Sequence, residues 1–137
     1  EEVKKKYPGK IRFVHKNIPL DFHKQARTAA LIYEGLVMTD KKKALEFYKA
    51  AYSQQPEWTG SKEKLLALAK KLGVSKEILA GQVKDGEITK RMAEDMAEFE
   101  KLGFDSTPSY VVNGVTMVGA QAPEELSAVI DRTLKKN

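Results

Sequence analysis

Residues 104–119, FDSTPSYVVNGVTMVG, constrain the fold of this chain more than any other part of its sequence. Strand-forming residues lie on both sides of Asn113-Gly114, and this dipeptide favours a β-hairpin because a type I′ turn needs positive φ at both central positions. Thr107-Pro108 stands where the first strand begins, a position at which the missing amide hydrogen of proline interrupts no ladder bond. The stretch therefore predicts a loop, an X-Pro step and a two-stranded hairpin.

Before the hairpin, the sequence predicts one strand and a long helical block. Polar and apolar residues alternate over Lys10–Val14, which is the pattern of a strand with Ile11 and Phe13 on one face. The longest helix is expected from about Glu87 to Leu102. Four residues are candidate N-caps, because their side-chain oxygens can accept a hydrogen bond from the first helical turn: Asp21, Asp40, Ser61 and Ser75.

Apolar residues that recur at helical spacing define the expected buried stripe of each helix. The stripes are Ala26, Ala29, Ala30, Tyr33 and Val37 after Asp21; Ala44, Leu45, Tyr48 and Tyr52 after Asp40; and Leu65, Leu68, Ala69 and Leu72 after Ser61. The longest helix has Ile88, Met92, Met96 and Phe99, and the closing helix from Pro123 has Leu126, Val129, Ile130 and Leu134. Together with the hairpin, these helices predict a mixed α/β domain.

Composition limits the classes of function. The chain has 137 residues, enough for one domain with a core, and its formal net charge is +5. It contains no Cys, which excludes thiol, disulfide or thiolate–metal chemistry by these residues themselves. The lysines are spread over helical segments, so we expect no nucleic acid partner. No apolar run reaches the roughly 18 residues of a spanning helix, so we expect no membrane insertion.

Residues 107–114, TPSYVVNG, followed by Gly119-Ala120-Gln121, resemble the cis-proline hairpin of the thioredoxin superfamily, in the form found in DsbA-like disulfide oxidoreductases. Tyr7–Val14 is similar to that family's second core strand, and His23–Ala26 to the start of its inserted helical region. The resemblance implies one incomplete thioredoxin-like domain over residues 1–137, with a helical insertion at about 22–103 and the hairpin plus C-terminal helix at about 104–137. It also implies extended polypeptide substrates and a periplasmic or otherwise extracytoplasmic location.

The same resemblance implies a sheet without its first, central strand and without the Cys-x-x-Cys helix, both of which would precede Glu1. That strand would lie between the strands at Ile11 and Tyr110, so its absence would leave two rows of backbone donors and acceptors unpaired. A buried unpaired group costs about 1–3 kcal/mol. We expect the gap to be filled by direct pairing of the flanking strands, by a domain-swapped homodimer, or by a strand donated from a separate chain.

Thr107, Pro108 and Ser109 are the candidate substrate-binding residues. The resemblance implies a cis peptide bond before Pro108 and a backbone at Thr107 that faces an extended substrate. No catalytic residue, metal ligand or cofactor is expected from this chain. His15 and His23 stand apart across a Pro-containing loop and have no Cys to activate, so we expect surface or loop-capping roles for them.

The remaining candidates have ordinary structural explanations. Asp105 and Glu34 are conceivable acids near a thioredoxin-like site, but carboxylates usually face solvent. Met92, Met96 and Phe99 are expected in the core, and Trp58 is expected to pack back onto the helices. Tyr110 and Met117 lie on the hairpin arms, where they can line a groove beside the proline.

Two functions follow, with a weaker third. The first is a piece of a DsbA-like thiol:disulfide interchange protein, which carries the cis-proline platform but is inactive alone because it has no redox cysteines. The alternative is a non-catalytic thioredoxin-like module that binds extended peptides by strand addition. A basic nucleic-acid-binding domain is the third and least favoured.

Overall fold

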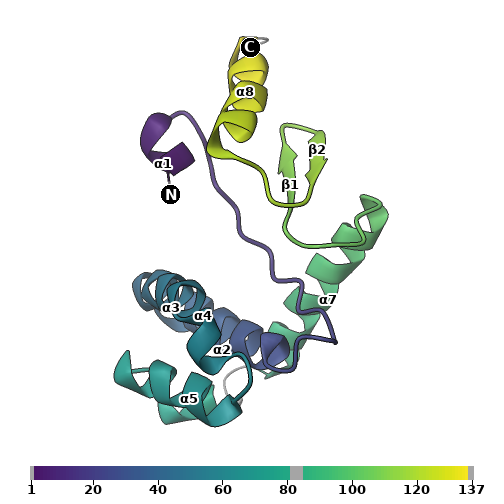
Figure 1. The fold of residues 1–137 in the computed structure, drawn as a ribbon. Helices are drawn as coiled ribbons and strands as arrows, with labels where there is room; N and C mark the ends of the chain where they lie inside the picture. Colours follow the sequence, from purple (N-terminus) through teal and green to yellow (C-terminus); the bar gives the residue numbers. More distant parts are fainter. Residues whose placement is uncertain (1, 81–84, 136–137) are drawn as a thin grey trace. The chain divides into compact units, whose positions relative to one another are not determined.

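The structure, a computed structural model, describes residues 2–80 and 85–135. Figure 1 shows its elements: α1 (Glu2–Lys6), α2 (Ala26–Thr39), α3 (Lys41–Ser53), α4 (Gln55–Trp58), α5 (Lys62–Lys71), α6 (Lys76–Leu79), α7 (Asp85–Lys101), β1 (Ser109–Val112), β2 (Val115–Val118) and α8 (Pro123–Leu134). They form two compact units, the hairpin unit (residues 1–16 and 96–137) and the helical unit (residues 17–95). Helix α7 crosses the boundary between the two.

The helical unit contains the main hydrophobic core, formed where α2 packs against α3, α5 and α6. Its most deeply buried side chains are Ile32, Leu36, Phe47 and Leu65. Trp58 is also buried, and its indole Nε1 donates a 2.9 Å hydrogen bond to the Ala51 carbonyl oxygen, as expected for a Trp packed back onto the helices. A smaller cluster joins Ala30 of α2 to Ile88 and Met92 of α7.

Three of the four predicted helix caps are confirmed. The side chain of Asp40 accepts a hydrogen bond from the Lys43 amide at 3.0 Å, and Ser61 and Ser75 cap α5 and α6 in the same way. The cap expected at Asp21 is wrong. Residues 21–25 form turns, and α2 begins at Ala26 after Gln25, which makes no side-chain cap hydrogen bond.

The buried face of α3 also differs from the predicted one. The helix buries Ala44, Phe47 and Ala51, whereas Leu45 and Tyr52 are exposed. Both faces of α3 carry large apolar residues at helical spacing, so periodicity alone favoured the stripe with two tyrosines. Packing against α2 selected the face with small alanines on either side of Phe47.

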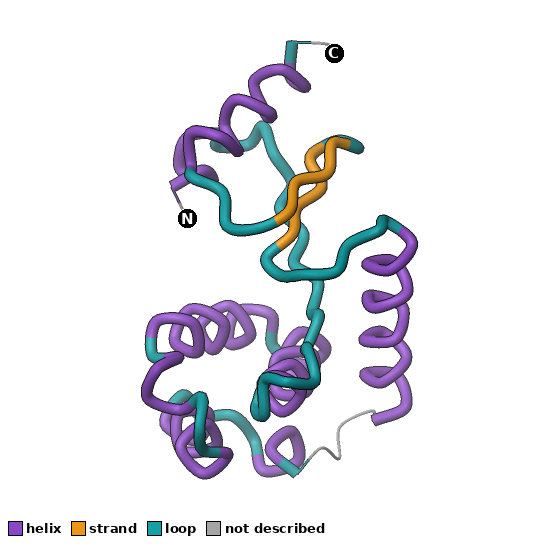
Figure 2. The backbone as a smooth tube through the Cα atoms, turned by 45° about the vertical axis from the view of Figure 1, so that its right-hand side comes forward, coloured by secondary structure: helices purple, strands orange, loops and turns teal. Residues whose placement is uncertain are grey.

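The predicted hairpin is confirmed. Strands β1 and β2 pair antiparallel with Val112 opposite Val115, which leaves Asn113 and Gly114 as a two-residue turn (Figure 2). Their φ angles of +46° and +85° match the left-handed backbone that a type I′ turn needs. Asparagine and glycine adopt this region at lower cost than other residues, so local sequence is sufficient to specify the turn.

The strands of the hairpin unit lie beside α8, and α1 packs on the same helix (Figure 1). Pro123 occupies the first turn of α8, and Glu125 reaches back to accept a 2.8 Å hydrogen bond from the Ala122 amide. The Tyr7 hydroxyl connects the N-terminal segment to α8, because it lies 2.7 Å from Asp131 Oδ1 and 3.1 Å from the Ser127 carbonyl oxygen.

The strand expected at Lys10–Val14 is wrong, because these residues form neither helix nor strand. An alternating sequence becomes a strand only where another strand can pair with it. Among the described residues, the sheet consists of β1 and β2, and neither is paired with Lys10–Val14. Phe13 and Val14 remain 54% and 57% exposed in consequence.

A candidate peptide-binding site at the X-Pro hairpin

The three residues singled out from the sequence lie together at the entrance to β1. The Thr107–Pro108 peptide bond is cis. Thr107 and Pro108 are exposed, while Ser109 is half-buried and donates a 2.6 Å hydrogen bond from its hydroxyl to the Ser106 carbonyl oxygen. The Gly119 amide donates to the Pro108 carbonyl oxygen at 2.9 Å, which extends the hairpin ladder back to the proline.

The register of the hairpin defines which backbone groups of β1 face outward. Hydrogen-bonded pairs alternate with non-bonded pairs in an antiparallel ladder, and the pair that closes a two-residue turn is hydrogen-bonded. Val112 and Tyr110 therefore direct their amide and carbonyl groups toward β2. Ser109 and Val111 direct theirs away from it, toward an edge with no paired strand in the part of the chain that the structure describes.

Both faces of the hairpin carry apolar side chains. Tyr110, Val112 and Met117 are half-buried on one face, where Val115 is 42% exposed. Val111 and Val118 share the other face and are 47% and 51% exposed. The outer edge of β1 is thus bordered by an apolar surface, which is the environment that an added strand with alternating side chains would need.

The other sequence candidates lie away from this arrangement or have structural partners. Asp105 is exposed and accepts a 3.0 Å hydrogen bond from the Ser106 hydroxyl. His15 is half-buried, and the exposed His23 lies beside Phe22 with ring centroids 4.5 Å apart. Met92 is buried, and Met96 and Phe99 are half-buried.

Glu34 is a correction to the expectation that carboxylates face solvent, because it is only 3% exposed. Arg91 Nε donates to Glu34 Oε2 at 3.0 Å, and Asn17 Nδ2 donates to Oε1 at 2.7 Å. The Asn17 amide also donates to Asp95 Oδ2 at 3.1 Å. This polar cluster joins α2, α7 and the segment before α2, and its donors satisfy both oxygens of the buried carboxylate.

Sequence reasoning did not find the partners of Glu34. The available signal was a single acid within the apolar run ALIYEGLV, residues 30–37. An acid in that position needs a buried partner. Arg91 is 57 residues away along the chain, so only the packing of α7 on α2 identifies it.

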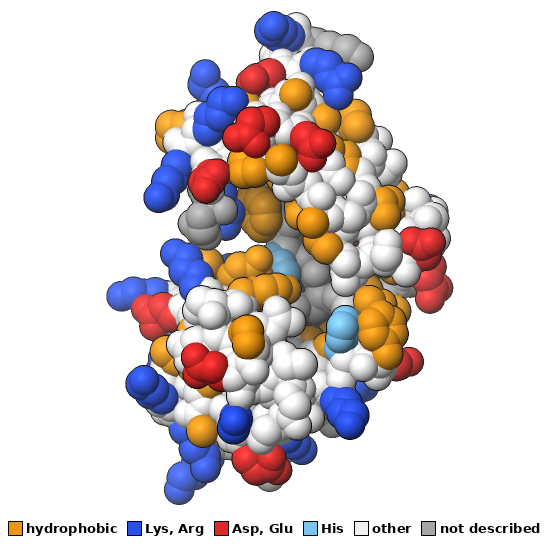
Figure 3. Space-filling view, viewed as in Figure 1, with side chains coloured by type: hydrophobic (Ala, Val, Ile, Leu, Met, Phe, Trp, Pro, Cys, Tyr) orange, Lys and Arg blue, Asp and Glu red, His pale blue; other side chains and the backbone are white. Residues whose placement is uncertain are grey.

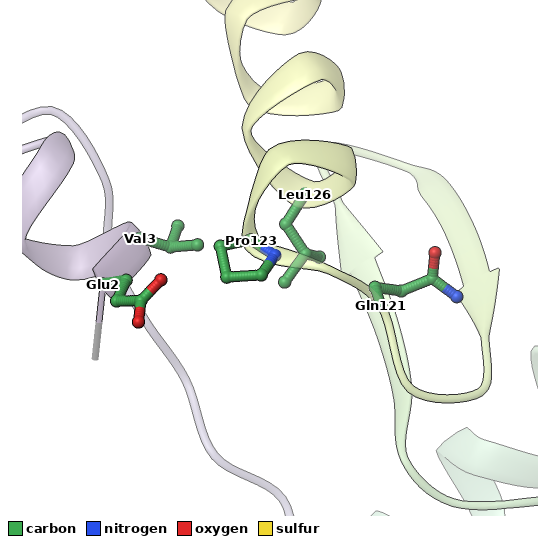
Figure 4. Close-up of a pocket in the computed structure, with 5 residues that line it drawn as sticks. All are labelled: Glu2, Val3, Gln121, Pro123 and Leu126. Atoms are coloured by element: carbon green, nitrogen blue, oxygen red, sulfur yellow. The ribbon is translucent and has the colours of Figure 1, made fainter.

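A shallow pocket of about 320 Å³ lies elsewhere in the hairpin unit, between α1 and the start of α8 (Figure 4). Its lining residues are Glu2, Val3, Gln121, Pro123 and Leu126. None of these is a strong nucleophile, and the pocket lacks a His or a thiol that could activate one. We therefore assign no chemistry to it.

Within residues 2–80 and 85–135, no group of three or more His, Asp or Glu side chains is arranged to hold a metal ion. None of the helices described is both long enough and apolar enough to cross a membrane.

The structure is thus a mixed α/β domain with a helical unit and a short antiparallel hairpin that is entered through an exposed X-Pro step. The chain matches the family model described as thioredoxin over residues 1–132, nearly its whole length. It therefore belongs to the thioredoxin family. Searches of curated proteins and of solved structures gave no significant match.

Proposed function

We propose that this chain is the substrate-binding part of a DsbA-like thiol:disulfide interchange protein that acts outside the cytoplasm. The observation that carries the proposal is the exposed Thr107–Pro108 step, which leads directly into a strand whose outer edge is unpaired among the described residues. Membership of the thioredoxin family and the TPSYVVNG sequence support the same function.

In the proposed mechanism, an extended substrate lies along the outer edge of β1. The outward amide and carbonyl groups of Ser109 and Val111 pair with the substrate backbone, and the exposed Thr107–Pro108 step holds the segment that carries the substrate's sulfur. Thiol–disulfide exchange needs a thiolate that attacks a disulfide sulfur. These 137 residues contain no Cys, so we expect them to bind substrate without turning it over.

Two measurements test this function. The pure chain should not increase the rate of insulin reduction above that of dithiothreitol alone, and measurable turnover would contradict the proposal. Binding can be followed by fluorescence anisotropy with a labelled peptide of alternating Thr and Val, a composition that favours extended backbone. Val111→Pro should abolish binding because it removes an outward amide of β1.

Val118→Pro is the matched control for that variant. The register directs the Val118 amide away from β1, so this change removes an amide from the opposite edge of the hairpin. It should leave peptide affinity within about twofold if the β1 edge is the binding edge. Equal loss of binding in both variants would show damage to the hairpin rather than to the site.

A non-catalytic peptide-binding module is the second candidate. It is favoured by the absence of Cys from the chain together with the outer edge of β1, which has no strand partner in residues 2–80 and 85–135. Both functions predict peptide binding, so a binding measurement does not distinguish them. The residues encoded immediately before Glu1 do. A Cys-x-x-Cys in the same reading frame supports the interchange protein, and a start codon close to Glu1 supports the module.

The same edge is also a candidate for pairing with a second copy or a donated strand. Unpaired strand edges are templates for association between chains. Light scattering across a range of concentrations tests a swapped homodimer. If the wild-type chain has the mass of a dimer and Val111→Pro has the mass of a monomer, the exchanged strand pairs with β1. A monomer mass at every concentration would exclude the swapped homodimer.

A further inference from the structure

We propose that the exposed side of α3 is a docking surface for an acidic amphipathic helix of another polypeptide. The surface, here called the tyrosine face, consists of Leu45, Tyr48 and Tyr52 of α3 and Tyr33 of α2. All four residues lie in the helical unit and none belongs to the hairpin. The inference does not depend on the peptide-binding function proposed for β1.

The tyrosine face lies at the margin of the helical core, because Tyr33 packs against that core whereas Leu45 and Tyr52 do not. Helix α3 buries Ala44, Phe47 and Ala51 on the adjacent side, while Leu45 is 45% exposed and Tyr52 is 59% exposed. Leu45, Tyr48 and Tyr52 follow the spacing i, i+3, i+7 and so form a stripe about 10 Å long on the helix surface. An exposed apolar stripe of this kind is the usual mark of an interaction site.

The rings of the tyrosine face contact one another and form a continuous surface. The Tyr48 ring centroid lies 4.8 Å from that of Tyr52 and 6.1 Å from that of Tyr33, with interplanar angles of 50° and 57°. Rings already packed together lose little rotamer freedom when a partner binds. Tyrosine is also among the residues that contribute most to binding energy at protein interfaces.

Charge around the stripe indicates the chemistry of the partner. Lys41, Lys42 and Lys49 are exposed on α3 beside it. Residues 41–76 contain nine lysines and three glutamates with no other charged residue, a net charge of +6, which exceeds the +5 of the whole chain. Figure 3 shows more basic (Lys and Arg) than acidic side chains in the lower part of the view, where α3 and α5 lie. A complementary partner carries acidic residues around its apolar contacts.

The geometry favours a helix over a nucleic acid or a lipid surface. Anchors at i, i+3 and i+7 on α3 match the i, i+3, i+4, i+7 spacing of an amphipathic helix laid along it. Base stacking would need open ring faces, but the Tyr48 ring already packs between Tyr33 and Tyr52. Leu45 is the one aliphatic side chain of the face, which offers little area for insertion into lipid.

Anisotropy measurements on the full chain test the proposal. The probe is a fluorescein-labelled 18-residue helical peptide with Leu and Phe at i, i+3, i+4 and i+7 and Glu at the remaining positions. We expect saturable binding that Leu45→Ala/Tyr52→Ala weakens by at least about tenfold, because it removes two interface anchors. Phe22→Ala is the matched control, since Phe22 is 75% exposed but lies outside the face.

Charge-reversal variants provide a second test of the same proposal. Lys41→Glu/Lys49→Glu should weaken binding several-fold more than Lys10→Glu/Lys24→Glu, which changes the net charge equally at exposed lysines elsewhere. Circular dichroism should show native helicity in every variant. Equal losses in the paired variants, no binding by the wild-type chain, or preferential binding of single-stranded DNA or anionic phosphatidylserine vesicles would overturn the proposal.

Discussion

At the scale of single residues, the contrast between Glu34 and the surface charges of this chain is informative. Glu34 is almost fully buried and has donors from two different elements. The ion pair between Lys16 and Glu98 is shorter, at 2.7 Å against 3.0 Å for Arg91 and Glu34, but both of its side chains are about half exposed. Burial strengthens an interaction between charges and raises the cost of leaving one unpaired, so the two pairs should differ in energy.

A double-mutant cycle measures that difference. Arg91→Met should destabilise the protein by about 2–3 kcal/mol, because it leaves a buried carboxylate without its cation. The Glu34→Gln/Arg91→Met cycle should give a coupling energy above about 1 kcal/mol, and the matched Lys16→Met/Glu98→Gln cycle should stay below it. Urea denaturation is the measurement, and equal coupling energies in the two cycles would contradict this account.

The tyrosines of the helical unit predict a loss of stability at high pH. Burial and the neighbouring Glu34 raise the pKa of Tyr33 above its ordinary value, despite the opposing effect of Arg91. Burial also raises the pKa of Tyr52, but 59% of that residue is exposed, so the prediction rests on Tyr33. Because the pKa of Tyr33 is higher in the folded state than in the unfolded state, its contribution to stability is full below the unfolded-state pKa near 10. That contribution falls as the pH rises through the folded-state pKa.

Chemical denaturation at pH 8 and pH 11 tests the predicted loss of stability at high pH. The wild-type protein should lose stability between the two conditions, and Tyr33→Phe should lose less because it removes the ionising hydroxyl. Lysine titration affects both proteins equally and cancels in the comparison. A larger loss in Tyr33→Phe than in the wild type would show that the sign is wrong.

At the scale of elements, the close approach of α2 and α6 depends on a glycine. Gly35 lies in the middle of α2, where glycine is normally unfavourable by about 1 kcal/mol relative to alanine. A Cβ at this position would lie 3.1 Å from the Cγ2 of Ile78, a buried residue of α6. The glycine therefore permits contact between helices at the expense of local helix propensity.

Gly35→Ala should consequently destabilise the protein, because the clash with Ile78 outweighs the gain in helix propensity. The same substitution in an Ile78→Ala background should be neutral or stabilising, since both contacting Cγ atoms are then absent. Thermal unfolding of the four proteins completes the cycle. If Gly35→Ala stabilises the otherwise wild-type protein, α6 can shift away from the added Cβ without loss of folding free energy, and the predicted clash is wrong.

At the scale of the whole molecule, apolar burial is distributed unevenly. Both hydrophobic clusters belong to the helical unit. The buried apolar residues described in the hairpin unit are Tyr7, Val129 and Ile130. Local stability follows buried apolar contact, so the hairpin unit should open at a lower free energy than the helical unit.

Hydrogen exchange followed by mass spectrometry tests this expectation. The amides of Tyr110 and Val112 pair with β2, as the amides of α2 pair within their helix, so a difference in protection between these two sets reports packing rather than local hydrogen bonding. The α2 amides should exchange at least about tenfold more slowly than those of Tyr110 and Val112. Protection that is equal in the two elements would indicate one cooperative unit.

The sequence by itself was sufficient for most local interactions, with the cap expected at Asp21 as the exception. Asn113-Gly114 specified the turn and register of the hairpin, and Asp40, Ser61 and Ser75 marked helix starts, because turn and cap hydrogen bonds span only a few residues. The TPSYVVNG sequence also indicated the family that the comparison then showed.

Tertiary structure decided what depends on partners distant in the chain. The alternation over Lys10–Val14 did not produce a strand because no strand pairs with it in the described residues. Packing against α2 buried Ala44, Phe47 and Ala51 of α3 and left Leu45 and Tyr52 exposed, and Glu34 was buried because α7 brought Arg91 to it. Periodicity shows that a residue can be buried, but the choice of face and partner belongs to packing between elements.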